Sequence, residues 1–276
     1  MSLSAVHEVR TAAPFVRNTL RAIGVVGLAI LAILVVGADV FARAPLGQAG
    51  YGPELAFPSA AFPFGTDEIG RDVLSETLYA LGSTVSRAVL ATIIVLLFGE
   101  LAGFAAARLG LGLGLVLRWI ARVLGAVPPL LLALLAIALS GADYAALAAG
   151  LAAVPLSFAR AFDRASNADR TANAEYARAT GIPPSTLFRR DLAYEFRDRI
   201  TSIAARAFAA VTTTLATASY LGFGVTPPAR GLGLMIAAAQ QYYLTAWWIA
   251  AFPALALILT VLFARLAAGL EEGERP

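Results

Sequence analysis

Long runs without charged residues divide this chain into segments of the length that crosses a membrane. Six such runs hold 16 to 34 residues, and only Glu100 interrupts one of them. A helix needs about 17–25 mostly apolar residues to cross a bilayer, and the alternation typical of a barrel strand is absent. Backbone polar groups cannot stay unpaired in lipid, so these segments must be helices. We predict an all-α polytopic membrane protein with six transmembrane helices, near residues 20–41, 84–107, 118–140, 144–163, 199–221 and 245–268.

The first apolar run has a second interpretation, as a cleavable signal peptide. Arg10, Arg17 and Arg21 precede it, and the tripeptide 42–44 (Ala-Arg-Ala) loosely fits a small-residue cleavage site. The apolar stretch is longer than the usual 7–15 residues of a signal peptide. This length favours a retained first helix.

The positions of the arginines predict the orientation. With the N-terminus inside, the internal segments hold 16 of the 21 arginines, namely Arg10, Arg17, Arg21, Arg108, Arg118, Arg122, Arg160, Arg164, Arg170, Arg178, Arg189, Arg190, Arg197, Arg199, Arg265 and Arg275. The external loops hold three: Arg43, Arg71 and Arg230. The positive-inside rule therefore places both termini in the cytoplasm.

Composition excludes several kinds of chemistry. Hydrophobic residues make up 59% and charged residues 14% of the chain, against about 45–50% and about 25% in soluble domains. All 21 basic residues are Arg, so a Lys-containing P-loop and a lysine Schiff base are both excluded. No Cys and a single His, His7, provide no thiolate or multi-His metal site. The net charge of +3 follows membrane sidedness and gives no basic face for nucleic acid.

Two predicted loops are too long to be simple connectors, which usually span about 2–8 residues. One is external, at residues 42–83, and one is internal, at residues 163–198. The predicted organisation is a cytoplasmic segment 1–19, a first helix with its periplasmic loop over 20–82, a core of five helices over 83–270 and a cytoplasmic tail 271–276.

The internal loop predicts a helix, a sharp turn and a second helix. Gly181 suits the left-handed position after a helix, and Pro183 and Pro184 prevent that helix from continuing. A second helix can begin near Ser185. A short helix of this kind can dock in a groove on another protein. It can equally be a solvated amphipathic linker that lies on lipid head groups.

The external loop contains a compact polar block. Thr66 or Asp67 can cap a following helix, and Arg71 can form an ion-pair cluster with three acids, Asp67, Glu68 and Asp72. The acids also allow a calcium site, but their spacing matches no EF-hand loop.

Three motifs resemble a known family. Glu175, Tyr176 and Ala177, followed by Gly181, resemble the "E-A-A, three residues, G" motif of ABC importer permeases. Residues 62–75 resemble the block "H-P-L/F-G-T-D-x-L-G-R-D-V-L-S" of the dipeptide, oligopeptide and nickel subfamily. Residues 220–235 resemble the "F-L-G-L-G-V-x-P-P … W-G-x-M" segment of that subfamily. Tyr176 stands where the family has Ala, and Leu232 where it has Trp. No Pro of the family's "I-x-L-P" type follows Asp191.

The resemblance implies a type I ABC importer permease, the second and smaller of a pair, in the bacterial inner membrane. It implies coupling to the ATPase through Glu175, Tyr176, Ala177, Arg178, Gly181, Arg189 and Arg190. It also implies a periplasmic signature loop that contains Gly65, Thr66, Asp67, Gly70, Arg71 and Asp72. The expected partners are a homologous permease, two ABC ATPases (or one fused), a substrate-binding protein and membrane lipids, with no nucleic acid. We expect no cofactor or metal in this chain and no catalysis by it, because ATP and Mg belong to the ATPases.

Some intramembrane residues can have either a functional or a structural role. Thr212, Thr213, Thr217 and Ser219 can line a polar path or bond neighbouring helices. Three prolines, Pro128, Pro129 and Pro155, can kink their helices. Glu100 is the only acid deep in a predicted span, so it is a functional candidate by default. We favour a structural role for it, paired with Arg118 or Arg122.

The resemblance indicates import of peptides delivered by the binding protein. A nickel or metal-chelate importer of the same family is the alternative, although one His and no Cys provide little for a soft metal. A secondary transporter or a membrane scaffold are alternatives from other classes. The former calls for ion-coupling residues and inverted repeats, and only Glu100 is available as a coupling residue.

Overall fold

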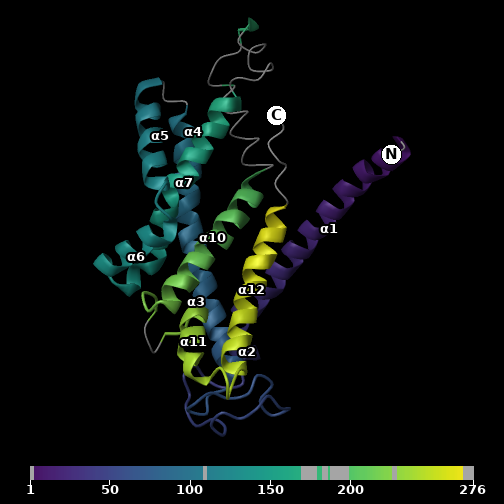
Figure 1. Cartoon of the computed structure of the whole chain (residues 1–276), viewed down its shortest axis with the longest axis vertical. Coiled ribbons are helices and arrows are strands. Elements are labelled where there is room, and N and C mark those ends of the chain that lie inside the picture. Colours follow the sequence, from purple (N-terminus) through teal and green to yellow (C-terminus); the bar gives the residue numbers. More distant parts are fainter. Residues whose placement is uncertain are drawn as a thin grey trace.

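A computed structural model of the chain describes residues 3–107, 111–168, 179–181, 186, 199–225 and 229–269. Within these ranges the regular elements are helices, and Thr66 and Asp72 form an isolated β-bridge. The helices are α1 (Leu3–Val36), α2 (Ala38–Phe41), α3 (Val73–Ile94), the π-helix η1 (Val95–Leu101), α4 (Ala102–Ala106), α5 (Leu111–Gly125), α6 (Pro129–Ser140), η2 (Ala142–Tyr144), α7 (Ala145–Ala168), α10 (Ile200–Tyr220), α11 (Leu232–Ala238), η4 (Ala239–Tyr242) and α12 (Trp248–Ala268). Figure 1 shows their arrangement.

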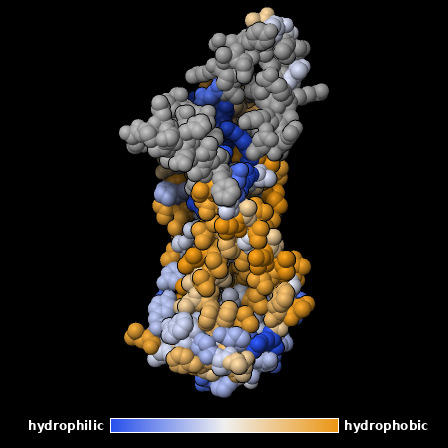
Figure 2. Space-filling model, turned by 90° about the vertical axis from the view of Figure 1, so that its right-hand side faces the viewer, coloured by the Kyte–Doolittle hydropathy of each residue, from blue (hydrophilic) through white to orange (hydrophobic). Residues whose placement is uncertain are grey.

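The predicted fold class is confirmed. Among the described residues, five helices are long and apolar enough to cross a membrane: Val16–Val36, Val73–Ala106, Ala142–Asn167, Ile200–Tyr220 and Trp248–Ala268. The bent pair Gly112–Gly125 and Pro129–Ser140 is apolar enough to be a sixth, broken span or a re-entrant loop. On the face seen in Figure 2, apolar residues form a band across the middle of the bundle and give way to polar residues at its lower end.

The third predicted helix, 118–140, is not continuous. The chain bends by 87° between α5 and α6. Pro129 begins α6, where its missing N–H costs nothing, and Pro128 precedes it in an extended conformation. The predicted kink at the two prolines is therefore a complete break. Pro155, by contrast, lies within an uninterrupted α7.

The second helix begins earlier than predicted, at Val73 instead of near residue 84. Together α3, η1 and α4 span 34 residues, about 51 Å at 1.5 Å per residue, which exceeds a hydrocarbon core of about 30 Å. The first turns of α3 bury Ser75, Glu76 and Thr77. The side chains of Ser75 and Glu76 bind backbone N–H groups of residues 42–72, which we call the cap.

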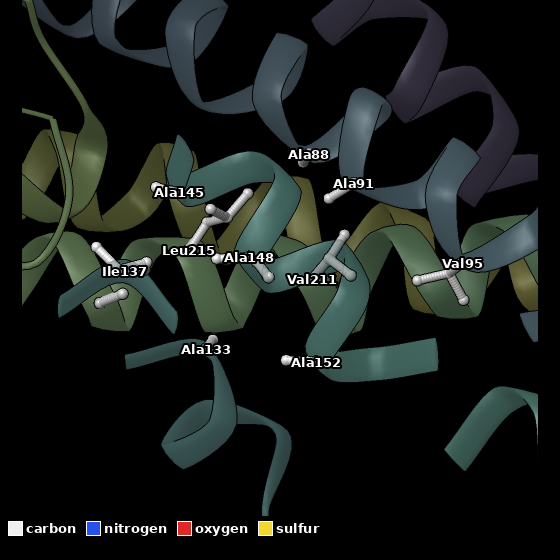
Figure 3. Packing of buried hydrophobic residues seen from close by; sticks show 12 residues of the cluster. Ala88, Ala91, Val95, Ala133, Ile137, Ala145, Ala148, Ala152, Val211 and Leu215 are labelled. Atoms are coloured by element: carbon white, nitrogen blue, oxygen red, sulfur yellow. The ribbon is translucent and has the colours of Figure 1, made fainter. Parts of the chain in front are cut away.

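The largest cluster of buried residues consists mostly of alanine (Figure 3). It joins α3, α6, α7 and α10, and Ala88, Ala91, Ala133 and Ala149 in it are almost completely buried. Helices in lipid gain little from excluding water between them, so close contact of small residues supplies much of their attraction. The fourth and fifth spans are thereby held against the second.

The ends of the helices are sorted to the two ends of the bundle. The start of α1, the end of α7, the start of α10 and the end of α12 lie toward one end, and the cap lies at the other (Figure 1). This arrangement agrees with an even number of membrane crossings.

Prediction for the α1–α12 contact. Gly24 lies directly against α12, where a Cβ at this position would approach the backbone N of Ala267 to 2.2 Å. We expect Gly24→Ala to cost about 1–3 kcal/mol of stability, because neither backbone can yield. Thermal unfolding in detergent measures this. Gly112→Ala is the matched control, since a Cβ there would meet nothing within 4 Å. Equal melting temperatures for the two variants would contradict the prediction.

Candidate functional site

The signature residues of the cap form a tight turn at the start of α3. Gly65 and Gly70 have φ of +73° and +72°, and a Cβ on either would approach a carbonyl oxygen, of Ala56 or Gly52, to 2.6 or 2.3 Å. Only glycine fits such positions. Gly65 accepts a hydrogen bond from the N–H of Val73 at 3.1 Å, so the turn contacts the first residue of α3.

Thr66 is fully buried and connects three parts of the cap and bundle. Its hydroxyl accepts a hydrogen bond from the N–H of Ala56 at 2.8 Å and donates one to the carbonyl of Pro53. Its own carbonyl accepts a hydrogen bond from Trp248 Nε1 at 3.0 Å. The first residue of α12 is therefore attached to the signature turn. Phe57 packs on the Trp248 ring, with 4.3 Å between ring centroids.

Asp67 and Arg71 confirm part of the predicted ion-pair cluster. Asp67 Oδ1 accepts hydrogen bonds from the N–H of Ile69 at 3.1 Å and of Arg71 at 2.9 Å, and its Oδ2 pairs with Arg71 Nε. Arg71 Nη2 lies 3.3 Å from Glu68 Oε1. Burial disfavours the charge on Arg71, but its hydrogen bond to Asp67 and the charges of the nearby carboxylates outweigh burial. The pKa of Arg71 is therefore raised.

Asp72 is the helix cap, which corrects the expectation that Thr66 or Asp67 would fill this role. Its Oδ2 accepts hydrogen bonds from the N–H of Ser75 at 2.9 Å and from the Ser75 hydroxyl at 2.6 Å. Asp72 is therefore not part of the ion-pair cluster. The hydroxyl oxygen of Ser75 in turn accepts hydrogen bonds from the N–H groups of Arg43 and Ala44, at 2.8 and 3.1 Å.

A buried ion pair joins α3 to the segment before α11. Glu76 and Arg230 form it, and their side chains are only 4% and 12% exposed. The second carboxylate oxygen, Oε1, accepts a hydrogen bond from the N–H of Gly47 at 2.6 Å. No sequence pattern pointed to this pair, because the partners are 154 residues apart.

The intramembrane carboxylate of Glu100 is paired, but not with the predicted partners. It lies in the π-helix η1, accepts a hydrogen bond from the Ser157 hydroxyl at 2.5 Å and forms an ion pair with Arg164. Arg118 and Arg122 instead bind Asp163, at 2.7 and 2.8 Å. Both contacts of Glu100 are made with α7.

The four residues proposed for the path have different environments. Thr212 is fully buried and donates its hydroxyl to the carbonyl of Phe208 at 2.6 Å, while Thr213 is exposed and donates to Ala209 at 2.9 Å. Thr217 is half-buried. Ser219 lines a small recess between α3 and α10. Their role in a path stays a prediction.

Most of the predicted coupling segment lies outside the described residues: Glu175, Tyr176, Ala177, Arg178, Arg189 and Arg190. Gly181 is described, and its φ of +76° is the left-handed conformation predicted from the sequence. A Cβ at Gly181 would meet nothing within 4 Å.

Comparison with known proteins gives the following relatives. No protein-family model matches the chain. The chain is 30% identical over 210 residues to the di/tripeptide transport system permease protein DppC of Pseudomonas aeruginosa (strain UCBPP-PA14), which covers 74% of this chain and 68% of that protein. It is 28% identical over 222 residues to the dipeptide transport system permease protein DppC of Escherichia coli K12, covering 79% and 74%. It is also 28% identical over 253 residues to the peptide transport system permease protein SapC of Escherichia coli O6:H1, covering 88% and 85%.

Prediction for the buried ion pair. Glu76→Gln leaves the Arg230 guanidinium buried without a counter-charge, so we expect a loss of about 3–5 kcal/mol in the free energy of unfolding. Denaturation in detergent measures it, with Glu54→Gln as a control at an exposed carboxylate of the same cap. The double variant Glu76→Gln/Arg230→Gln should cost less than the sum of the two single changes. A strictly additive double variant would argue against the pairing.

Proposed function

This chain belongs to the permease proteins of peptide transport systems, and on that premise we propose that it is the transmembrane subunit of an ATP-driven ABC importer of di- or oligopeptides. The observation that carries the proposal is the 30% identity to a di/tripeptide permease over 68% of that protein's length. The helical membrane architecture and the signature turn of the cap support it.

The proposed complex has parts that this chain does not supply. A homologous second permease would complete the path, because one chain of this size forms one wall of it. Two ABC ATPases, or one fused, would bind ATP and Mg, since a chain without lysine cannot build a P-loop. An extracytoplasmic binding protein would deliver the peptide. The chain itself would then be non-catalytic.

The chain is a multi-pass inner-membrane protein, and we place both termini in the cytoplasm. Clustering of arginine in the internal segments supports this orientation. The cap would accordingly face the binding protein. The end at which α7 finishes and α10 begins would face the ATPases.

The mechanism that follows is alternating access. Closure of the ATPases on ATP would move the segment that contains Glu175 and Gly181, and this movement would enter α7 and α10 directly because the segment joins them. The Glu100–Arg164 pair ties α7 to η1, so a displacement of α7 would also reach the second span. Peptide would cross the membrane when the two permeases rock against each other and expose the path to the cytoplasm.

Other substrates and classes receive less support. The relatives reported above are named for peptides, so nickel import is not favoured. Over the described part of the chain, no three His, Cys, Asp or Glu side chains are grouped as a metal site. Membership of the permease family also disfavours the secondary-transporter and scaffold alternatives.

The decisive experiment is peptide uptake by proteoliposomes that contain the complex purified from its native membrane. We expect uptake of a labelled dipeptide that depends on the binding protein and on ATP inside the vesicle. Uptake driven by an ion gradient without ATP would indicate a secondary transporter. A chain that purifies alone and gives no uptake would indicate a scaffold.

Prediction for coupling. A β-branched residue is strained at positive φ, so Gly181→Val should distort the turn that joins the two halves of the coupling segment. We expect uptake to fall several-fold while the complex still assembles and hydrolyses ATP. Gly141→Val is the matched control: Gly141 also has positive φ, +98°, and open space around it, but lies just before α7, at the opposite end of that helix. Equal uptake by the two variants would refute the coupling role.

A further inference from the structure

Arg87 is a half-buried arginine that lines a recess formed by four parts of the chain. The recess lies between α3, the start of α7, the end of α10 and the segment before α11. Besides Arg87, its polar side chains are Thr84 and Ser219, and its apolar wall includes Ala145, Leu215, Ala216 and Val225. The recess is small and partly open.

No carboxylate of the described residues lies within ion-pair distance of Arg87, in contrast to three other arginines of the bundle. Arg164 pairs with Glu100, Arg230 with Glu76, and Arg118 with Asp163. The hydrogen-bond partner of Arg87 is the hydroxyl oxygen of Ser83. A charged side chain within a membrane-spanning helix is costly and usually serves a function.

The neighbours of Arg87 are suited to an anion. The Ser83 hydroxyl donates its own hydrogen to the carbonyl of Arg230, and the Thr84 hydroxyl oxygen accepts a hydrogen bond from the N–H of Leu232 at 3.1 Å. The hydrogen of the Thr84 hydroxyl is therefore available to a further acceptor. Ser219 adds a second, half-buried hydroxyl. A guanidinium flanked by hydroxyl donors matches the geometry of a carboxylate, which it can bind through two parallel hydrogen bonds.

Asp143 is not the ion-pair partner of Arg87. It lies two residues before Ala145 and acts on Arg87 through its charge, without an ion pair between the two among the described contacts. The fixed partner of Arg87, Ser83, is neutral and can be retained when an anion binds.

We propose that Arg87, with the hydroxyls of Thr84 and Ser219, is a subsite for the C-terminal carboxylate of the transported peptide. This inference rests on the proposed function. A free peptide always ends in a carboxylate, whatever its side chains, so a subsite of this kind would accept peptides of many sequences. It would also bring one of the four proposed path residues, Ser219, into direct contact with the substrate.

The test compares uptake of dialanine and of its C-terminal amide by proteoliposomes that hold the complete complex, both at saturating concentration. Arg87→Gln should lower uptake of dialanine by about tenfold, the effect of losing one charged hydrogen-bond pair. It should leave uptake of the amide unchanged. Arg87→Lys retains the charge and should recover part of the loss. Size-exclusion profiles of the variants check that the complex has assembled.

Two outcomes would overturn the subsite. Equal losses for the free peptide and the amide would assign Arg87 to packing, or to a lipid phosphate if anionic lipid restores both rates. Unchanged uptake of dialanine by Arg87→Gln would remove the residue from the path altogether. Failure of the proposed function is distinguishable, because the wild-type complex would then take up neither peptide in the presence of ATP.

Discussion

A carboxylate buried at the cap end of α3 must find a cation inside the protein, and much of the arrangement at this end depends on how Glu76 meets that requirement. Its partner, Arg230, lies 154 residues away, in the segment that leads into α11. The remaining carboxylate oxygen binds the backbone of Gly47. One side chain therefore holds together the cap, the second span and the connection between the last two spans, and removing either charge leaves the other one stranded.

The rest of the bundle is held by contacts of another kind. Alanine dominates the shared core of α3, α6, α7 and α10, and glycine allows α1 to approach the backbone of α12. Such contacts are individually weak and depend on fit. Polar contacts therefore hold the helices together at the cap, and close packing of small residues holds them in the middle of the bundle. This division suits helices that must shift against one another while staying attached at one end.

Sequence reasoning located most of the spans, because a bilayer imposes a length and a lack of charge that can be read directly. It failed where a long-range partner decides the outcome. The start of α3 at Val73 was missed because its polar first turns are buried by the cap, which no local pattern indicates. Glu100 was expected to pair with Arg118 or Arg122, but its partner is Arg164, 64 residues away on α7. The sequence motif of the cap could be recognised. Its internal hydrogen bonds could not be predicted, because they depend on the positive φ angles of its glycines, which only the fold reveals. Pro128 and Pro129 marked a disturbance correctly, but the sequence alone did not give its size.

The π-helix limits which sequence changes this chain can accept during evolution. In a π-helix each turn takes up more residues than in an α-helix, so the faces of the helix before Val95 and after Leu101 are out of phase with one another. A residue inserted or deleted here acts as a rotation of about 100° applied to everything beyond it, with only a slight change in length. Glu100 and the small residues Gly99 and Gly103, which fit closely against α7, meet that helix in one angular setting only. Insertion or deletion of a single residue in this stretch would therefore turn the contact surface of the second span away from its neighbour, although the length of the helix would hardly change.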